Sequence, residues 1–100
     1  MPSQFNPAVN SGPIKRMEKL TSKFATANTL AGAGFTIPAN TARIALQPSA
    51  ACHYTVRGTA TATFSKAVAA NEVFILEPGQ HTASIIGDAG AIDVIVAYMK

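Results

Sequence analysis

ARIALQPSAACHYTVRGT, residues 42–59, contains two runs in which apolar and polar side chains alternate. In the first run Ile44 and Leu46 share one face, and the second run, Cys52 to Val56, repeats the pattern. A period of two residues is typical of a half-buried β-strand. A Pro-Ser pair stops the first run and a Gly-Thr pair stops the second. The stretch therefore predicts two short strands joined by a turn.

Strand-like runs recur about every ten residues, with Gly, Pro or Asn between them, as in a β-sandwich or small barrel. No window after residue 26 shows helical periodicity. The last run is apolar on both faces, which predicts a central strand or one covered by a neighbouring subunit. The further predicted strands are 20–26 (with a short helix over 17–25 as the alternative), 29–37 (bent at its glycines), 59–64, 72–77, 82–86 and 91–99. The side chains that we expect to be mostly buried are Ile44, Leu46, Tyr54, Val56, Val73, Ile75, Ile85, Val94 and Val96.

The composition predicts one small domain with a thin core. The chain has 100 residues, of which 48% are hydrophobic but only 7% are aromatic, and none is Trp. Much of the apolar content is alanine, which contributes little buried area at about 25 cal/mol per Å². We therefore expect further burial from neighbouring subunits in a homo-oligomer.

Residues 1–20 predict an extended N-terminal arm that precedes a domain over residues 21–100. Prolines interrupt the first 14 residues and disfavour a helix or a central strand. The arm is either a floppy terminus or a segment that becomes ordered on a neighbouring subunit. In the second case we expect two groups of partner-binding residues: the apolar anchors Phe5, Val9 and Ile14, and the bases Lys15, Arg16 and Lys19, which would face acidic groups.

The net charge of +3 is concentrated near the N-terminus. Residues 1–23 hold four basic side chains and one acidic one, whereas residues 24–100 hold four of each. Nucleic-acid modules interleave such bases with stacking aromatics, and only Phe24 is near. Nucleic acid is therefore a disfavoured partner.

The sequence offers little for covalent chemistry. It contains no glycine-rich phosphate loop, no CxxC and no HExxH. His53 and His81 have no second histidine at metal-ligand spacing, so we expect them at the surface or on an edge strand, with no metal or cofactor. Cys52 shares a strand face with Tyr54, which favours an inert core thiol. No catalytic residue is assigned, and the prediction is that the chain is not an enzyme.

Asp93 is the one acid within an apolar run, between Ile92 and Val94. It predicts an acid that faces solvent beside a sheet edge, a subunit contact, or a salt bridge to a base such as Arg43 or Arg57.

The start of the sequence lacks the charged and apolar regions of a signal peptide, and no run reaches the roughly 18 to 20 apolar residues of a membrane span. A single cysteine excludes an intrachain disulfide. These features favour synthesis in a cytoplasm and no membrane partner.

Residues 42–99 resemble short structural proteins encoded in the virion gene clusters of tailed bacteriophages. The shared features occur in one order: a hydrophobic strand ending in Gln, a strand ending in Arg before Gly-Thr, a Thr/Ala stretch, a Glu-apolar strand start, and an apolar last strand ending in an aromatic residue. Here they are ARIALQ (42–47), YTVRGT (54–59), the stretch that follows it, ANEVF (70–74) and IDVIVAY (92–98). The resemblance implies an all-β, small jelly-roll-like β-sandwich with a structural role.

The resemblance and the arm together predict a capsid decoration or cement protein located in the virion. It would bind the major capsid protein or another virion protein, with a homotrimer favoured. Alternatives are a neck, tail or baseplate component, and a carbohydrate-binding β-sandwich, which the scarcity of aromatic residues disfavours.

Overall fold

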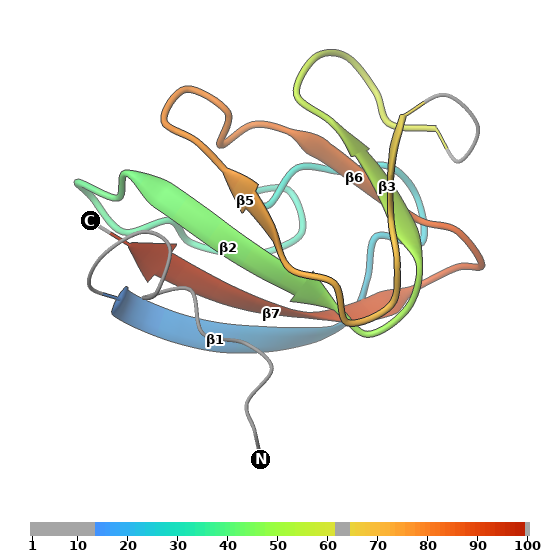
Figure 1. Cartoon of the computed structure of the whole chain (residues 1–100), viewed down its shortest axis with the longest axis horizontal. Coiled ribbons are helices and arrows are strands. Elements are labelled where there is room, and N and C mark those ends of the chain that lie inside the picture. The colour runs from blue at the N-terminus through green and yellow to red at the C-terminus, as the bar shows by residue number, and fades with distance from the viewer. Residues whose placement is uncertain (1–13, 62–64, 100) are drawn as a thin grey trace.

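Two antiparallel sheets make up the described part of the chain, residues 14–61 and 65–99 of a computed structural model (Figure 1). No helix occurs among these residues, which confirms the all-β prediction. Sheet A has the strand order β1-β7-β2-β5, and sheet B has the order β4-β3-β6. The strands are β1 (Ile14–Lys23), β2 (Arg43–Pro48), β3 (Cys52–Thr55), β4 (Lys66–Val68), β5 (Phe74–Leu76), β6 (Ser84–Gly87) and β7 (Ile92–Met99).

The strand β7 lies at the centre of sheet A, as its two apolar faces predicted. It pairs with β1 on one side and with β2 on the other, both antiparallel. Val94 and Val96 are buried on the side facing sheet B, whereas Asp93 and Ile95 are half-buried on the opposite side.

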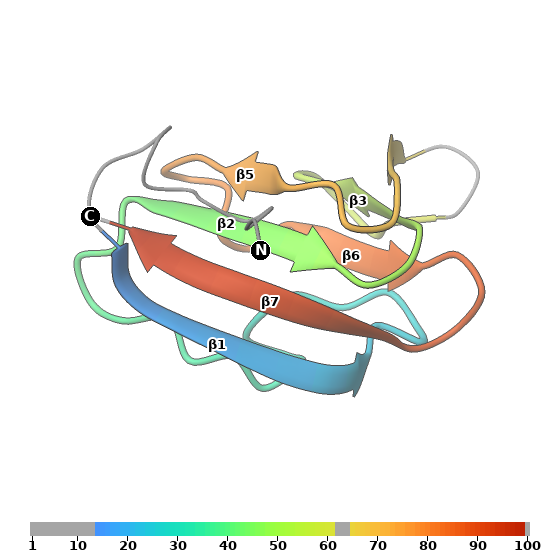
Figure 2. The ribbon, with the colours of Figure 1, turned by 60° about the horizontal axis from the view of Figure 1, so that its bottom comes forward.

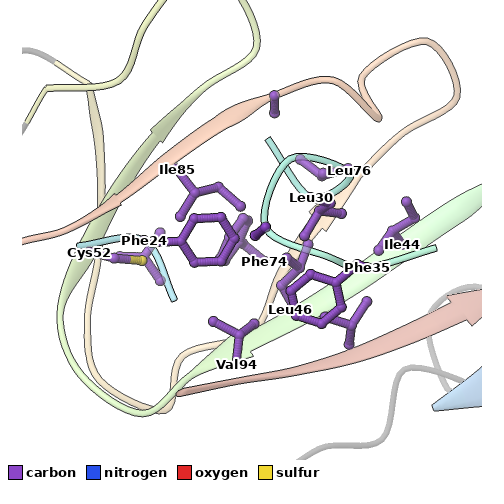
Figure 3. Close-up of a cluster of buried hydrophobic side chains, with 14 of the residues drawn as sticks. Phe24, Leu30, Phe35, Ile44, Leu46, Cys52, Phe74, Leu76, Ile85 and Val94 are labelled. Carbon is purple, nitrogen blue, oxygen red and sulfur yellow. The ribbon is translucent and has the colours of Figure 1, made fainter. Parts of the chain in front are cut away.

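The core lies between the two sheets (Figure 2). It joins Ile44 and Leu46 from sheet A to Cys52, Val68 and Ile85 from sheet B. Figure 3 shows Leu46, Cys52 and Ile85 converging with Leu30 and Phe35 from the segment between β1 and β2. The arrangement is a two-layered all-β fold with a single main core.

Of the nine side chains predicted to be mostly buried, five are buried, three are half-buried and one is exposed. Val56 is 42% exposed, so its assignment to the core was wrong. The strand β3 ends one residue earlier, where the Thr55 hydroxyl donates to the Arg57 carbonyl and turns the chain. The residues confirmed as fully buried are Ile44, Leu46, Ile85, Val94 and Val96, while Tyr54, Val73 and Ile75 are half-buried.

The predicted strand over residues 29–37 is not formed. The chain there makes a tight turn in which the Phe35 amide donates to the Leu30 carbonyl at 3.0 Å. Gly34 adopts φ +103°, a conformation that favours glycine. Leu30 and Phe35 are buried, and the Phe35 ring stacks on Phe24 with centroids 6.5 Å apart. Burial of these large side chains determines the path of the chain in this segment. Their spacing of five residues would place them on opposite faces of a strand.

The strand β1 confirms a strand near Leu20, but it begins at Ile14. The predicted boundary between residues 20 and 21 therefore falls inside a strand, and residues 14–20 belong to sheet A. A register shift after Leu20 places Ser22 and Phe24 at φ 57° and 65° and turns the Phe24 ring into the core. The preceding part of the predicted arm, residues 1–13, lies outside the described residues.

Two predicted strands are displaced. One edge strand of sheet B is β4, Lys66–Val68, whereas the predicted strand was 59–64. Residues 62–64 of that range lie outside the described residues. The strand predicted over 82–86 runs from Ser84 to Gly87. In this part of the chain the weak Thr/Ala alternation did not mark the strand ends.

Candidate functional site

The predicted partner-binding residues fall on β1 or before it. Phe5, Val9 and the side chains of Ile14 and Lys15 lie outside the described residues, although the backbone of Ile14 pairs with Met99. Lys19 is exposed on β1. The structure thus brings the bases of the prediction onto the edge strand of sheet A and not onto a separate arm.

Arg16 is engaged within the chain. Its Nη2 atom donates to the Thr36 carbonyl at 2.6 Å and lies 3.6 Å from Glu18 Oε2. Its guanidinium also lies 5.1 Å from the centroid of the Tyr98 ring, close enough for a cation–π contact. Arg16 therefore holds the 34–37 loop against β1, a role that the sequence did not predict.

Tyr98 closes this cluster from the core side. Its hydroxyl donates to Glu18 Oε2. Burial, together with this hydrogen bond and the Glu18 charge, raises the pKa of Tyr98 well above its ordinary value. The tyrosine stays neutral at physiological pH, and its role here is structural.

Part of the outer face of sheet A, the side turned away from the core, is apolar. A sheet with one solvated face alternates apolar and polar residues, and polar side chains usually occupy the outer positions. Here the outer face carries a second buried cluster of Ala45, Ala97 and Met99, against which Val73 and Ile75 pack. Met17, on β1 opposite Ala97, is 46% exposed.

A hollow of about 200 Å³ lies at one end of this outer face. It is lined by Lys19, Gln47, Ser49, Asn71, Asp93 and Ile95. Gln47 Nε2 donates to the Asn71 carbonyl at 3.1 Å, which fixes the floor of the hollow. The lining holds one basic side chain, Lys19, and one acidic one, Asp93, and among the described residues no carboxylate lies within salt-bridge distance of Lys19.

Asp93 does not pair with Arg43 or Arg57 in the described structure. Its Oδ1 atom accepts a hydrogen bond from the Ser22 amide at 3.1 Å, and its own amide donates to Ser49 Oγ at 3.0 Å. Arg43 pairs instead with Glu77, with Nε to Oε1 at 2.6 Å. The carboxylate of Asp93 therefore accepts a hydrogen bond from a backbone amide at the irregular end of β1.

The two histidines occupy separate sites. His53 Nδ1 lies 2.6 Å from Asp88 Oδ1, because pairing of β3 with β6 sets Cys52 opposite Gly87. His81 Nε2 lies 2.9 Å from the Ala42 carbonyl. Among the described residues no three His, Cys, Asp or Glu side chains gather in a way that could hold a metal ion. The His53–Asp88 pair escaped the sequence analysis because the strand register alone brings the two residues together.

Cys52 is free and buried in the core, as predicted. Burial raises the pKa of its thiol from 9.0 to about 11, and the charges of Asp88 and Glu72 add to the rise. Since the thiolate is the reactive form, a rise of this size lowers its population near neutral pH by about 100-fold.

We therefore expect native Cys52 to react with iodoacetamide at pH 8 at least 100-fold more slowly than in the urea-unfolded chain, because burial adds a steric barrier to the lower thiolate population. The extent of alkylation over time is read by mass spectrometry. A small-molecule thiol of ordinary pKa in the same tube controls for the effect of urea on the reagent. Similar rates in folded and unfolded protein would contradict the burial of this thiol.

The described residues form no helix long and apolar enough to cross a membrane. Comparison with protein-family models, with curated proteins and with solved structures finds no match to this chain. The fold and the surface define a class of small, two-sheeted all-β proteins with an apolar outer sheet face and a basic edge strand.

Proposed function

We propose that the chain is a structural protein of a bacteriophage virion, a capsid decoration or cement protein with a jelly-roll-like fold. In this role it binds the major capsid protein or another virion protein and assembles as a homotrimer. The likeness of residues 42–99 to short phage structural proteins supports the setting. In this role the chain binds its partner through a broad surface and catalyses no reaction.

The observation that carries the proposal is the apolar outer face of sheet A. Val73, Ile75 and Ile95 are half-buried there and Met17 is exposed, on the side of the sheet opposite the main core. Apolar patches of this kind mark protein–protein contact sites. Covering them contributes about 25 cal/mol per Å², and repeated copies on a particle add avidity. Phe5 and Val9, the apolar anchors predicted from the sequence, are proposed as further contact residues.

The proposal predicts that Val73→Glu lowers attachment to purified phage heads at least tenfold. The substitution places a charge on the apolar face, and a buried unpaired charge in a contact is strongly unfavourable. Attachment is measured by co-sedimentation of the full chain with heads that lack it. Val56→Glu is the matched control, since Val56 is exposed beyond sheet B, away from this face.

The number of copies per purified particle separates the positions in the virion. Hundreds of copies support decoration of the head, whereas tens or fewer indicate a neck, tail or baseplate component.

Circular dichroism confirms that both glutamate variants are folded. Absence of the protein from purified particles contradicts the virion setting, and equal attachment of the two variants shows that the outer face is not the contact.

A further inference from the structure

The strand β1 is a long open edge. It is the terminal strand of sheet A, and its ten residues span about 33 Å. Among the described residues, no backbone hydrogen bond joins β1 to any element other than β7. In Figures 1 and 2, β1 (blue) is the outermost strand of its sheet. Its second row of backbone N–H and C=O groups therefore has no pairing strand among the described residues.

All of the net charge of the chain lies on this strand. Residues 14–23 hold the bases Lys15, Arg16, Lys19 and Lys23 against the single acid Glu18, which gives +3. Residues 1–13 carry no charged side chain, and the charges of residues 24–100 cancel. No carboxylate lies within salt-bridge distance of Lys19 or Lys23 among the described residues. The open edge is thus also the basic region of the molecule.

We propose that β1 accepts an additional β-strand from an acidic, extended segment of a partner protein. A polypeptide strand supplies both donors and acceptors to the free backbone groups, while its carboxylates offset the charge of the edge. The inference deepens the proposed function and rests on it for the setting, since it names the chemistry of the partner segment.

Side-chain alternation specifies the partner further. Met17 and Lys19 lie on the outer face of sheet A, opposite Ala97 and Ile95 of β7. A strand added beside β1 places its outward side chains next to these two, because successive residues alternate between faces. The favoured segment has an apolar residue beside Met17 and an acid beside Lys19, two positions apart.

The same charge argues against two other occupants. A second copy of this chain would bring one +3 strand against another, and like charges on adjacent strands are unfavourable. A nucleic acid supplies acceptors but few donors for the backbone, and its bases need an aromatic platform. Phe24, the aromatic residue nearest β1 in sequence, is buried in the core. An acidic peptide strand supplies both the backbone donors and acceptors and the negative charge that the edge lacks.

The test titrates isotope-labelled full chain with the capped eight-residue peptide Val-Thr-Glu-Thr-Val-Thr-Glu-Thr at about 0.1 M salt, where charges more than about 10 Å apart are largely screened. Valine and glutamate alternate along one face of this peptide, two positions apart, as do Met17 and Lys19 on β1. We expect backbone amide shifts centred on residues 16–21. Lys19→Glu should weaken binding at least tenfold. Lys66→Glu is the matched control, because Lys66 is also exposed on an edge strand, β4 of sheet B, and the change in net charge is the same. That variant should bind within about twofold of the unmodified chain, since Lys66 lies on the other sheet and long-range charge effects are screened.

Three results would overturn the inference: no shifts with this peptide, shifts centred on another element, or equal weakening by the two variants. The same peptide with lysine in place of glutamate also excludes the inference if it binds as well. Tighter binding of a short DNA duplex, lost in Lys19→Glu, assigns the edge to nucleic acid instead. The peptide result is independent of particle counts, so failure of the virion proposal and failure of the edge-strand proposal are separately visible.

Discussion

Replacing Leu46 by alanine is expected to lower the free energy of unfolding by about 3 kcal/mol. Leu46 is fully buried, and its strand β2 is hydrogen-bonded on both sides, to β5 and to β7. A strand held on both sides cannot shift to close the cavity, so both the transfer energy and the cavity energy are lost. The measurement is equilibrium unfolding in urea, followed by circular dichroism.

Two further variants with smaller expected losses are compared with Leu46→Ala. Val94→Ala on the central strand removes less volume and should cost about 2 kcal/mol. Met17→Ala, at a side chain that is 46% exposed, should change the free energy of unfolding by no more than about 0.5 kcal/mol. A loss below about 1 kcal/mol for Leu46→Ala contradicts the placement of Leu46 between the two sheets.

The strands that sequence alone predicted well are those with strong alternation or continuous apolar character. The strand β2 shows Ile44 and Leu46 on one face, and β7 is apolar on both faces because one face packs in the main core and the other belongs to the second buried cluster. These patterns arise directly from which side chains are buried, so periodicity recovers them.

Segments whose path depends on distant contacts were not predicted. Residues 29–37 look strand-like, but Leu30 and Phe35 are buried from a turn, because the Phe24 and Phe35 rings stack. Similarly, β1 begins at Ile14 because β7 offers a partner as far as Met99. Local composition carries no information on the length of a pairing strand.

The candidate site was only partly visible in the sequence. The cluster of bases near Lys19 is apparent, but their position on an open edge follows from the sheet order. Arg16 bonds to the Thr36 carbonyl, 20 residues away, and the hollow unites residues from three strands and two turns. Such a site becomes apparent only when the register of the strands is known.

Gly87→Ala is expected to destabilise the fold by about 3 kcal/mol or more. A Cβ atom at this position would lie 2.1 Å from the Gly90 carbonyl oxygen and 3.0 Å from Ile92 Cγ2. The first contact is with backbone, which cannot rotate away. Gly87 is also buried, pairs with Cys52 and donates its amide to the Phe24 carbonyl at 2.8 Å, so its own backbone is held as well.

Gly32→Ala provides the matched control, because its Cβ atom would also meet an oxygen at 2.1 Å, namely Asn28 Oδ1. That oxygen belongs to an exposed side chain that can turn away and give up one hydrogen bond to the Thr29 amide. Its loss should cost about 1 kcal/mol or less, partly offset by the lower entropy of the unfolded chain. Urea unfolding of both variants tests the contrast. Equal stability of the two variants would mean that the backbone from Gly87 to Gly90 moves as easily as a surface side chain. The short distance between a Cβ atom at Gly87 and the Gly90 carbonyl oxygen would then not constrain the turn between β6 and β7.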